Sequence, residues 1–584
     1  MLLAALVAAA AQVFWLTARV HLRGELLGSA RELPWISPLA YLAWFLPPAL
    51  VLLLLATRIT ALRSPRLQGA VVGALASFAL LLQVPGLHAL AIVALALGVG
   101  VQLGRMLGQD VARGMRRARV ATLVLAGALF VAGIPGIVFY RVHQRIQLRG
   151  LAVAADDAPN IVLLILDTVR AANLSVYGYA RPTSPSLERL AAEGVLFESA
   201  MAPAPWTAPS HATMLTGRYP FHLGISYRTP MVDSVRTVAE VLQAKGYATA
   251  AFMGNAYYAG RRTGFDRGFA RYDDYPFSLW QLFWSSSLSQ LEISRRIVQT
   301  VRAGVTRGRL AALLHAEFRI VGENQGDRYT AEELVENFTE WRSGIGRRPF
   351  FAMLNFFDAH SPYESPLQTR FAGGRTSLDA YDGAIAYSDS MIGRLRAHLQ
   401  QSGELDNTIF VVVADHGEQF GEHDLNGHGN SLYLELLHVP LLIRAPGRVP
   451  GGVRVPEVVS LRDVPATLLD LAGIPGSGIP GYSLAPLWRD SAAALVSPAL
   501  AEAEHPANQR NAWPTSYGPM KSVVTAGYHY IRRGDGQERV FRWGEDTTGR
   551  GDVTPTEHGR AVIDSSRAVL ERLLGPNWTQ LGPR

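Results

Sequence analysis

The sequence predicts an all-α domain of five transmembrane helices, followed by an α/β domain with a mostly parallel sheet covered by helices on both faces. Uncharged apolar stretches crowd the first 150 of the 584 residues, and short apolar runs then alternate with helical patterns. Acidic residues and histidines directly follow several of those short runs. We expect boundaries at 1–150 for the transmembrane domain, 151–490 for the α/β domain, and 491–584 for a C-terminal subdomain with a small antiparallel sheet and a tail.

The composition excludes several kinds of site. The chain has no Cys, so disulfides, zinc thiolate sites and cysteine nucleophiles are absent. The net charge of +7 comes almost entirely from Arg, because Lys245 and Lys521 are the only lysines. No basic run is interleaved with aromatic residues, so we expect no nucleic-acid partner. We assign the positive balance to a membrane surface and to anionic substrates.

Five apolar stretches are the predicted spans. They cover residues 1–17, 35–57, 67–84, 87–103 and 120–140. The third and fourth are separated only by Pro85 and Gly86, which indicates a tight hairpin. The first stretch lacks a basic region before it and four more follow, so a retained helix is favoured over a signal peptide. Arg-rich loops after the second span and before the fifth predict that both loops lie inside.

This charge pattern predicts a multi-pass protein of a bacterial-type inner (plasma) membrane. Everything after Tyr140 would then lie on the periplasmic or extracellular side. An insertion at 277–320 is rich in aromatic residues followed by arginines, which suits either a helix on a lipid surface or a helical pair that covers the sheet. The expected partners are the membrane and a lipid or glycolipid substrate, and the oligomeric state is left open.

The α/β domain shows strands and helices in alternation. Buried strands are predicted at 161–166, 248–253, 350–357, 409–413 and 439–443, and helices at 186–193, 235–244, 330–342 and 381–400. Ligands of such sheets bind at the carboxyl ends of the strands. Asp167 follows the first strand, Asp358 and His360 follow the third, and Asp415 and His416 follow the fourth. A lone Asp after a strand is usually a turn residue, but three such strand ends indicate a shared site.

A second signal is the segment PWTAPSHATMLTGRYP, residues 205–220, which resembles a loop that delivers a hydroxyl group to the first turn of a helix. Thr207 stands just before Pro209, and helical spacing continues until Gly217. A helix N-terminus favours an anionic group, so Thr207 is a candidate nucleophile towards a tetrahedral anion. The alternative is that Thr207 serves only as the N-cap.

Carboxylate oxygens together with an imidazole nitrogen suit one divalent metal ion. A cation of the Zn, Mn or Mg type fits, with Zn or Mn favoured, Ca is less natural once His is a ligand, and a second ion is left open. The predicted ligands are Asp167, Thr207, Asp415 and His416. Contact with the metal would lower the pKa of the Thr207 hydroxyl group and activate it for attack.

Three histidines complete the predicted catalytic set around Thr207. His360 and His428 would donate hydrogen bonds to the substrate's nonbridging oxygens or protonate the leaving group, with an ordinary surface-loop role as the alternative. His211 lies one turn into the Thr207 helix and would point at the same anion.

Several motifs in order resemble the sulfatase branch of the alkaline phosphatase superfamily. They are DTVRAANLSVYGYARPTSPSLERLAAEGVLFESAMA, TAPSHATMLTGRYP, PFFAMLNFFDAHSPY, VVADHGEQFGEH and GHGNSLYLELLHVPLLIRAPG, between about residues 159 and 488. The resemblance implies a site with one or two metals that handles phosphate or sulfate esters. The residues that match family positions are Asp167, Asp415 and His416 as metal ligands, Thr207 as nucleophile, and His360 and His428 as substrate contacts.

The chain departs from sulfatases at the nucleophile. Sulfatases carry Cys or Ser in C-x-P-S-R and oxidise it to formylglycine, whereas this chain has Thr207 there and His211 in place of the Arg. Thr carries a methyl group on its carbinol carbon and cannot give that aldehyde. The T-x-P-N-H motif of nucleotide pyrophosphatases is also similar, and it implies a variant in which Asp358, His360 and His428 bind a second ion.

A Thr nucleophile after five spans resembles lipoteichoic acid synthases and lipid A phosphoethanolamine transferases. This resemblance predicts a metal-dependent membrane enzyme of the cell envelope. It would transfer a phospho-group such as phosphoethanolamine or phosphoglycerol to a lipid or envelope-glycan headgroup, through a phospho-threonine intermediate. The alternatives are a sulfatase-like hydrolase of phosphate, phosphodiester or sulfate esters, and a catalytically inactive envelope scaffold.

Overall fold

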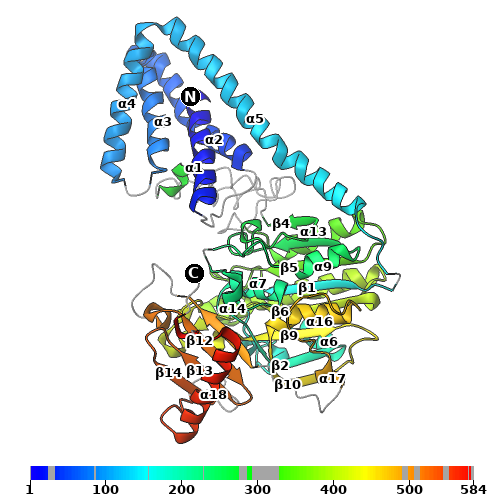
Figure 1. Cartoon of the computed structure of the whole chain (residues 1–584). Coiled ribbons are helices and arrows are strands. Elements are labelled where there is room, and N and C mark those ends of the chain that lie inside the picture. Colours follow the sequence, from blue (N-terminus) through cyan, green and yellow to red (C-terminus); the bar gives the residue numbers. More distant parts are fainter. Residues whose placement is uncertain are drawn as a thin grey trace. The chain divides into compact units, whose positions relative to one another are not determined.

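The computed structural model divides the chain into two compact units, Met1–Ile146 with Pro276–Asp327, and Gln147–Tyr275 with Arg328–Arg584 (Figure 1). It describes residues 2–23, 33–84, 87–155, 157–227, 229–274, 286–291, 328–489, 498–504, 513–542, 551–576 and 578–580. The insertion predicted at 277–320 lies outside the described residues, except for 286–291. The domain boundaries predicted after residues 150 and 490 stay predictions.

The first unit is built from helices. They are α1 (Leu2–Arg23), α2 (Leu33–Arg58), α3 (Pro65–Leu81), α4 (Ala89–Gln109) and α5 (Val111–Arg149), with short 3-10 turns η1 (Thr60–Arg63) and η5 (Ser287–Gln290). Each predicted apolar stretch lies on one of these helices. Among the described residues, however, only Ile36–Arg58 and Ala89–Gln109 are long and apolar enough to cross a bilayer. The apolar parts of α1 and α3 are shorter than the roughly 20 residues that about 30 Å of hydrocarbon requires.

The predicted hairpin of the third and fourth stretches is confirmed by the contact between α3 and α4. Glycines on both helices bring the two backbones together. A Cβ atom on Gly104 would lie 2.4 Å from the carbonyl oxygen of Arg66, and one on Gly100 would lie 2.5 Å from that of Ala70. Only the absence of side chains at these positions allows so close an approach.

The second unit contains an eight-stranded sheet with the order β10-β2-β9-β6-β1-β5-β3-β4. Its strands are β1 (Asn160–Leu166), β2 (Val195–Met201), β3 (Ala248–Met253), β4 (Arg271–Asp273), β5 (Phe350–Phe356), β6 (Thr408–Ala414), β9 (His438–Arg444) and β10 (Val453–Ser460). Strand β9 runs antiparallel to β2 and β6, and all other pairs are parallel. The predicted mostly parallel sheet is therefore confirmed.

Both faces of the central strands are covered. Every residue of β1, β5 and β6 is buried, and successive side chains of a strand point to opposite faces. The main helices of this unit are α6 (Pro185–Ala192), α7 (Thr207–Thr216), α9 (Val238–Ala244), α13 (Ala331–Gly344), α14 (Ser377–Gln401) and α16 (Val464–Leu471). Helix α14 contacts α6 and α13, while α7 contacts α9 and α16 (Figure 1).

A smaller antiparallel sheet follows towards the C-terminus. Its strands β11 (Ala499–Ala503), β12 (Met520–Thr525), β13 (Tyr528–Arg532) and β14 (Glu538–Arg542) pair in chain order, and helix α18 (Glu557–Leu574) contacts three of them. A two-stranded ribbon, β7 (Gln419–Phe420) with β8 (Asn426–Gly427), lies beyond the end of β6.

Helix α7 gives a direct test of the fold. It ends at Gly217, whose φ is +68°, and a Cβ atom there would lie 1.9 Å from the carbonyl oxygen of Pro480. Gly403 has a φ of +72° but open space around it. We predict that Gly217→Ala lowers the free energy of unfolding by about 3 kcal/mol, since a left-handed backbone and overpacking combine, whereas Gly403→Ala lowers it by about 1 kcal/mol. Equal losses in chemical denaturation would contradict the structure.

Candidate active site

Four neighbouring parallel strands end at the same edge of the large sheet. Strands β6, β1, β5 and β3 are adjacent in that order. Asp415 and His416 follow β6, Asp167 follows β1, Asp358 follows β5, and Asn255 follows β3. The strand order itself therefore brings these side chains together, as expected for a ligand site of a parallel sheet.

Asp167, Asp415 and His416 form a buried cluster, which we call the ligand cluster. One ligand atom from each lies within 4.8 Å of the others. His416 Nδ1 donates to the carbonyl oxygen of Gly417 at 3.0 Å, so its Nε2 carries the free lone pair. Asp167 Oδ1 and Asp415 Oδ2 accept no hydrogen bond from any described residue. Orphaned buried carboxylate oxygens beside an imidazole lone pair fit a divalent cation.

The electrostatics of the ligand cluster also favour a cation. Burial raises the pKa of Asp415 to about 7 and that of Asp167 to about 6, where the nearby Asp415 charge adds to the effect. Burial lowers the pKa of His416 to about 4, so its ring is neutral near pH 7. Among the described residues, neither carboxylate forms an ion pair with Lys or Arg. A bound cation would supply the missing positive charge.

Thr207 directs its hydroxyl group at the ligand cluster. It is the first residue of α7, and Trp206 occupies the N-cap position. Thr207 is 1% exposed, its Oγ1 lies 3.4 Å from His416 Nε2, and it accepts a hydrogen bond from Asn255 Nδ2 at 3.2 Å. The alternative in which Thr207 is the N-cap is therefore wrong.

Asn255 is a site residue that the sequence analysis missed. Its side-chain Nδ2 donates to both Asp167 Oδ2, at 3.1 Å, and Thr207 Oγ1. Its backbone N–H donates to Asn355 Oδ1 at 3.0 Å, and Asn355 Nδ2 donates in turn to Asp167 Oδ2 at 3.3 Å. The signal was present, because Asn255 lies two residues after a predicted strand, where the predicted ligands also lie.

A strained backbone position supports Asp415. Thr168 has a φ of +61°, which is rare for a β-branched residue. In this conformation its N–H donates to Asp415 Oδ1 at 3.2 Å. Hydrogen bonds to Ala359 O and from the Tyr381 hydroxyl group hold Thr168 in place. Such strain costs about 1–3 kcal/mol and persists where the surroundings fix it, commonly at functional sites.

His211 lies beside the ligand cluster. Its Nδ1 donates to the carbonyl oxygen of Thr207 at 3.0 Å and lies 3.5 Å from Asp415 Oδ2. The ring is fully buried and stacks on Phe265, and burial lowers its pKa to about 3. A neutral His211 therefore contacts both the backbone of Thr207, the candidate nucleophile, and Asp415, a candidate metal ligand.

The other two predicted histidines lie next to the ligand cluster. The ring of His428 lies 4.6 Å from that of His416 and 5.1 Å from that of His360, between centroids. His428 Nδ1 lies 3.2 Å from a carboxylate oxygen of buried Glu418, and His360 Nδ1 donates to Ser361 O at 2.9 Å. Burial lowers the pKa of both histidines to about 4. Glu418 is a second neighbour that the sequence analysis missed.

The structure gives no support to the two-metal variant. Asp358 Oδ2 accepts a hydrogen bond from the backbone N–H of Ala331 at 3.0 Å, at the start of α13. In the part of the chain that the structure describes, Asp167, Asp415 and His416 are the one group of three or more such side chains placed to hold a metal. Asp358 therefore caps a helix.

Comparisons with known proteins agree with this geometry. Residues 159–474 match the family model named Sulfatase. Arylsulfatase K of Bos taurus is 27% identical over 367 residues, covering 58% of this chain and 67% of the relative. An ulvan-active sulfatase of Formosa agariphila is 26% identical over 422 residues, covering 66% and 74%. The crystal structure of a phosphonate monoester hydrolase of Agrobacterium radiobacter shares the fold, with a TM-score of 0.54, 20% identity, and coverage of 71% of this chain and 96% of that one.

Metal content tests the ligand cluster. We predict that the purified chain holds about one divalent ion, Zn or Mn, and that Asp415→Asn weakens binding of that ion at least about tenfold, because a charged ligand becomes a neutral amide. Asp358→Asn is the matched control, since this buried carboxylate caps a helix and should leave metal content unchanged. Elemental analysis and calorimetric titration make the measurement, and equal metal content in the wild type and Asp415→Asn would contradict the assignment.

Proposed function

Because the chain belongs to the sulfatase family of the alkaline phosphatase superfamily, we propose that it is a metal-dependent hydrolase of singly charged ester anions with Thr207 as its nucleophile. The observation that carries this proposal is the position of Thr207 Oγ1, buried at a helix N-terminus and 3.4 Å from the imidazole of the ligand cluster. The sulfatase relatives support hydrolysis better than they support the predicted phospho-group transfer.

The charge balance of the site selects the substrate class. A divalent ion would be neutralised by Asp167 and Asp415, and the neighbouring histidines are neutral because burial lowers their pKa values. Little positive charge is then left for the substrate. A dianionic phosphate monoester would be poorly compensated in so buried a site, whereas a phosphodiester, a phosphonate monoester or a sulfate monoester each carries a single negative charge.

The residues of the chain suggest a two-step reaction. Thr207 Oγ1 gives up its proton and forms a bond to the central phosphorus or sulfur while the bond to the leaving oxygen breaks. The leaving oxygen takes up one proton and departs as the alcohol. Asn255 holds the attacking oxygen against Asp167, so the nucleophile is oriented before the substrate arrives. Asp167, Asp415 and His416 would hold a metal ion, which would supply Lewis-acid stabilisation of the reacting oxygens and would lower the pKa of the Thr207 hydroxyl group.

In the second step, water attacks the same central atom and frees Thr207. His360 and His428 suit this step. Contacts with Ser361 and Glu418 favour a proton on Nδ1 of each ring, which leaves each Nε2 as a proton acceptor for the attacking water. The net reaction adds water across the ester bond.

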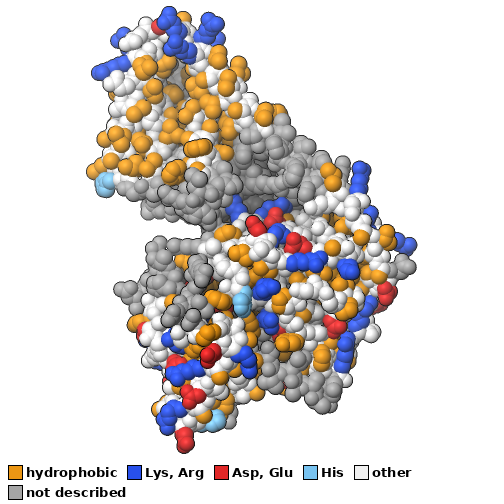
Figure 2. Space-filling view, viewed as in Figure 1, with side chains coloured by type: hydrophobic (Ala, Val, Ile, Leu, Met, Phe, Trp, Pro, Cys, Tyr) orange, Lys and Arg blue, Asp and Glu red, His pale blue; other side chains and the backbone are white. Residues whose placement is uncertain are grey.

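Transfer to a lipid or envelope-glycan headgroup is the second candidate. It differs only in the second step, in which an acceptor alcohol replaces water. The feature that favours it is the helical unit, which we propose anchors the enzyme in a bacterial-type plasma membrane with the second unit outside. Figure 2 shows hydrophobic side chains spread over the surface of this unit and Arg side chains gathered at one end. The tight glycine contact of α3 with α4 is also typical of membrane helices.

Thr207 variants test the nucleophile. We predict that Thr207→Ala lowers kcat on bis-p-nitrophenyl phosphate by about a thousandfold or more, because the attacking oxygen is removed, whereas Thr207→Ser retains measurable turnover. Thr213→Ala removes another buried hydroxyl group of α7 and should stay within a few-fold of the wild type. A chelator should abolish wild-type activity.

The same assay also compares substrates that carry different negative charges. The wild type should favour the diester or p-nitrophenyl sulfate over dianionic p-nitrophenyl phosphate in kcat/KM. Full activity in Thr207→Ala, or a preference for the dianion, would refute the proposed mechanism. Mass spectrometry of the wild type during turnover should find the added group on the peptide that contains Thr207.

Membrane anchoring has its own test. We predict that the full chain stays in the membrane pellet after an alkaline carbonate wash, because α2 and α4 bury apolar surface in the hydrocarbon layer. A peripheral membrane protein serves as the control that the wash releases. Release of the full chain into the supernatant would contradict anchoring and remove the support for lipid transfer.

A further inference from the structure

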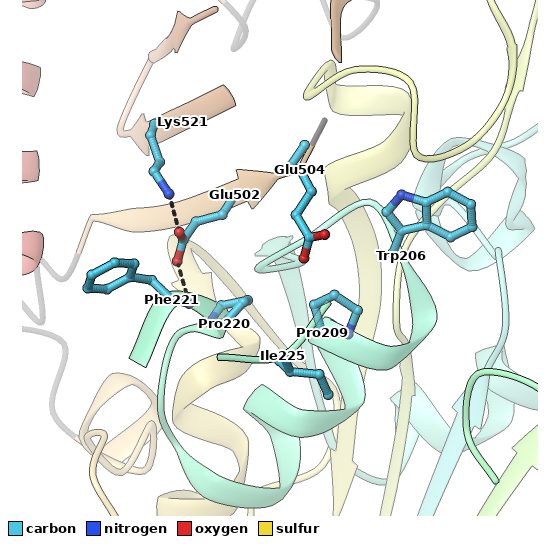
Figure 3. A pocket seen from close by; sticks show the side chains of 9 residues that line it. Trp206, Pro209, Pro220, Phe221, Ile225, Glu502, Glu504 and Lys521 are labelled. Atoms are coloured by element: carbon cyan, nitrogen blue, oxygen red, sulfur yellow. Dashed lines mark hydrogen bonds and ion pairs between the residues drawn. The ribbon is translucent and has the colours of Figure 1, made fainter. Parts of the chain in front are cut away.

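A second pocket lies within the second unit, next to the start of α7. It is enclosed by α7, by α8 (Pro220–Leu223) and by strands β11 and β12 of the small sheet (Figure 3). Pro209 and Phe221 give it apolar walls, and the polar groups that line it are Glu502, Glu504 and Lys521. None of these residues takes part in the reaction proposed above.

The two carboxylates of this pocket differ in their partners. Glu502 forms an ion pair with Lys521 and accepts a hydrogen bond from the backbone N–H of Phe221 at 3.2 Å, so its charge is compensated. Glu504 hydrogen-bonds with the Ser226 hydroxyl group and forms no ion pair with any described residue. Figure 3 shows its carboxylate pointing into the space between Trp206 and the pair Pro209 and Ile225.

Burial makes the negative charge of the Glu504 carboxylate unfavourable unless a cation lies beside it. Burial raises its pKa to about 7, and the like charge of Glu502 adds to this, against the opposing effects of Ser226 and Lys521. A partly buried carboxylate without a cation of its own is stabilised when a cation binds beside it. Among the described residues that line the pocket, the Glu504 carboxylate therefore has no positively charged side chain paired with it.

Trp206 connects this pocket to the site of Thr207. It lines the pocket, directly precedes the nucleophile, and meets the His428 ring edge-on at 5.1 Å. The indole stacks on Tyr227 at 5.3 Å, and a Cβ atom on Gly429 would lie 2.2 Å from it, so its position is fixed from two sides. The same side chain thus lines the pocket and contacts a histidine of the candidate active site.

The size of the pocket limits its occupant. Its cavity volume is about 20 Å³, which suits one small group. Apolar walls suit methylene groups, while Glu504 and the indole suit a positive charge. A metal ion is a poor fit, because Glu504 is the one unpaired carboxylate among the described residues that line the pocket.

We infer that this pocket binds a small alkylammonium group, either as part of the ester cleaved at Thr207 or as a free amine. The first form rests on the proposed function, because it makes Glu504 a determinant of substrate choice: an ester whose alcohol carries an amino group would place its ammonium group against Glu504. The second form does not depend on the reaction. The two forms share one ligand chemistry and are separated by experiment.

The activity arm compares two p-nitrophenyl phosphodiesters of equal length, the 2-aminoethyl ester and the uncharged propyl ester. The wild type should favour the aminoethyl ester about tenfold or more in kcat/KM, as expected for a charge-assisted hydrogen bond. Glu504→Gln should bring that ratio close to one. Glu457→Gln removes an exposed carboxylate elsewhere in the same unit and should keep the wild-type ratio.

The binding arm needs no turnover. Propylammonium chloride should change the tryptophan fluorescence of the wild type beyond the effect of equal NaCl, and both Glu504→Gln and Trp206→Phe should abolish that change. Binding without an ester preference supports the free amine, and binding with the preference supports the substrate form. If neither ester is cleaved, the proposed function fails and the binding arm alone decides. Absence of both the ester preference and the fluorescence change would overturn the inference.

Discussion

The site depends on two carboxylates that are buried together. Asp167 and Asp415 follow adjacent parallel strands, so the pairing of β1 with β6 fixes their separation before any side chain is considered. Both are fully buried, and each keeps one oxygen without a hydrogen bond from the described residues. Two such groups would repel each other and lose their hydration on folding, so the arrangement is stable only when protons or a cation compensate the charge. The ligand set is therefore dictated by the sheet.

The surroundings of these carboxylates are built almost entirely from neutral donors. Thr168 N–H reaches Asp415, and the side-chain amides of Asn255 and Asn355 reach Asp167. None of these groups cancels negative charge, but each fixes the direction of a carboxylate oxygen. Asn255 extends the same network to Thr207, so orientation of the nucleophile and orientation of a ligand depend on one side chain. Such coupling would orient the Thr207 hydroxyl group for the attack proposed above.

Most of the fold follows from sequence because its signals are local. The uniformly apolar runs of β1, β5 and β6 could be read directly, and Gly217 correctly marked the end of α7. Three strands of the large sheet, β2, β4 and β10, were not predicted. Strand β2, VLFESAM, mixes polar and apolar residues, and β10 is an edge strand with exposed positions. The antiparallel direction of β9 could not be predicted either, because the direction of a strand in a sheet depends on partner strands far away in the chain.

The residues of the candidate site were likewise predicted only in part. An acid after a strand and a Thr before a helix can be recognised from the sequence alone. Those patterns predicted Asp167, Asp415, His416 and Thr207. Asn255 and Glu418 were not predicted. Asn255 follows a predicted strand, but its partner Thr207 lies 48 residues away along the chain, so only the folded structure shows that the two meet.

The charge balance of the candidate site bears on which substrates it would bind. In sulfatases, by family resemblance, cationic side chains share the task of binding the anion, whereas here His211 and His428 are neutral and the two lysines lie elsewhere. A divalent ion held by the ligand cluster would be balanced by its two carboxylates and would leave little positive charge for a substrate. Tight binding of a highly charged ester is disfavoured in such a site, and specificity has to arise from groups at its border. Trp206, which directly precedes Thr207, lines the Glu504 pocket and contacts His428, occupies that border.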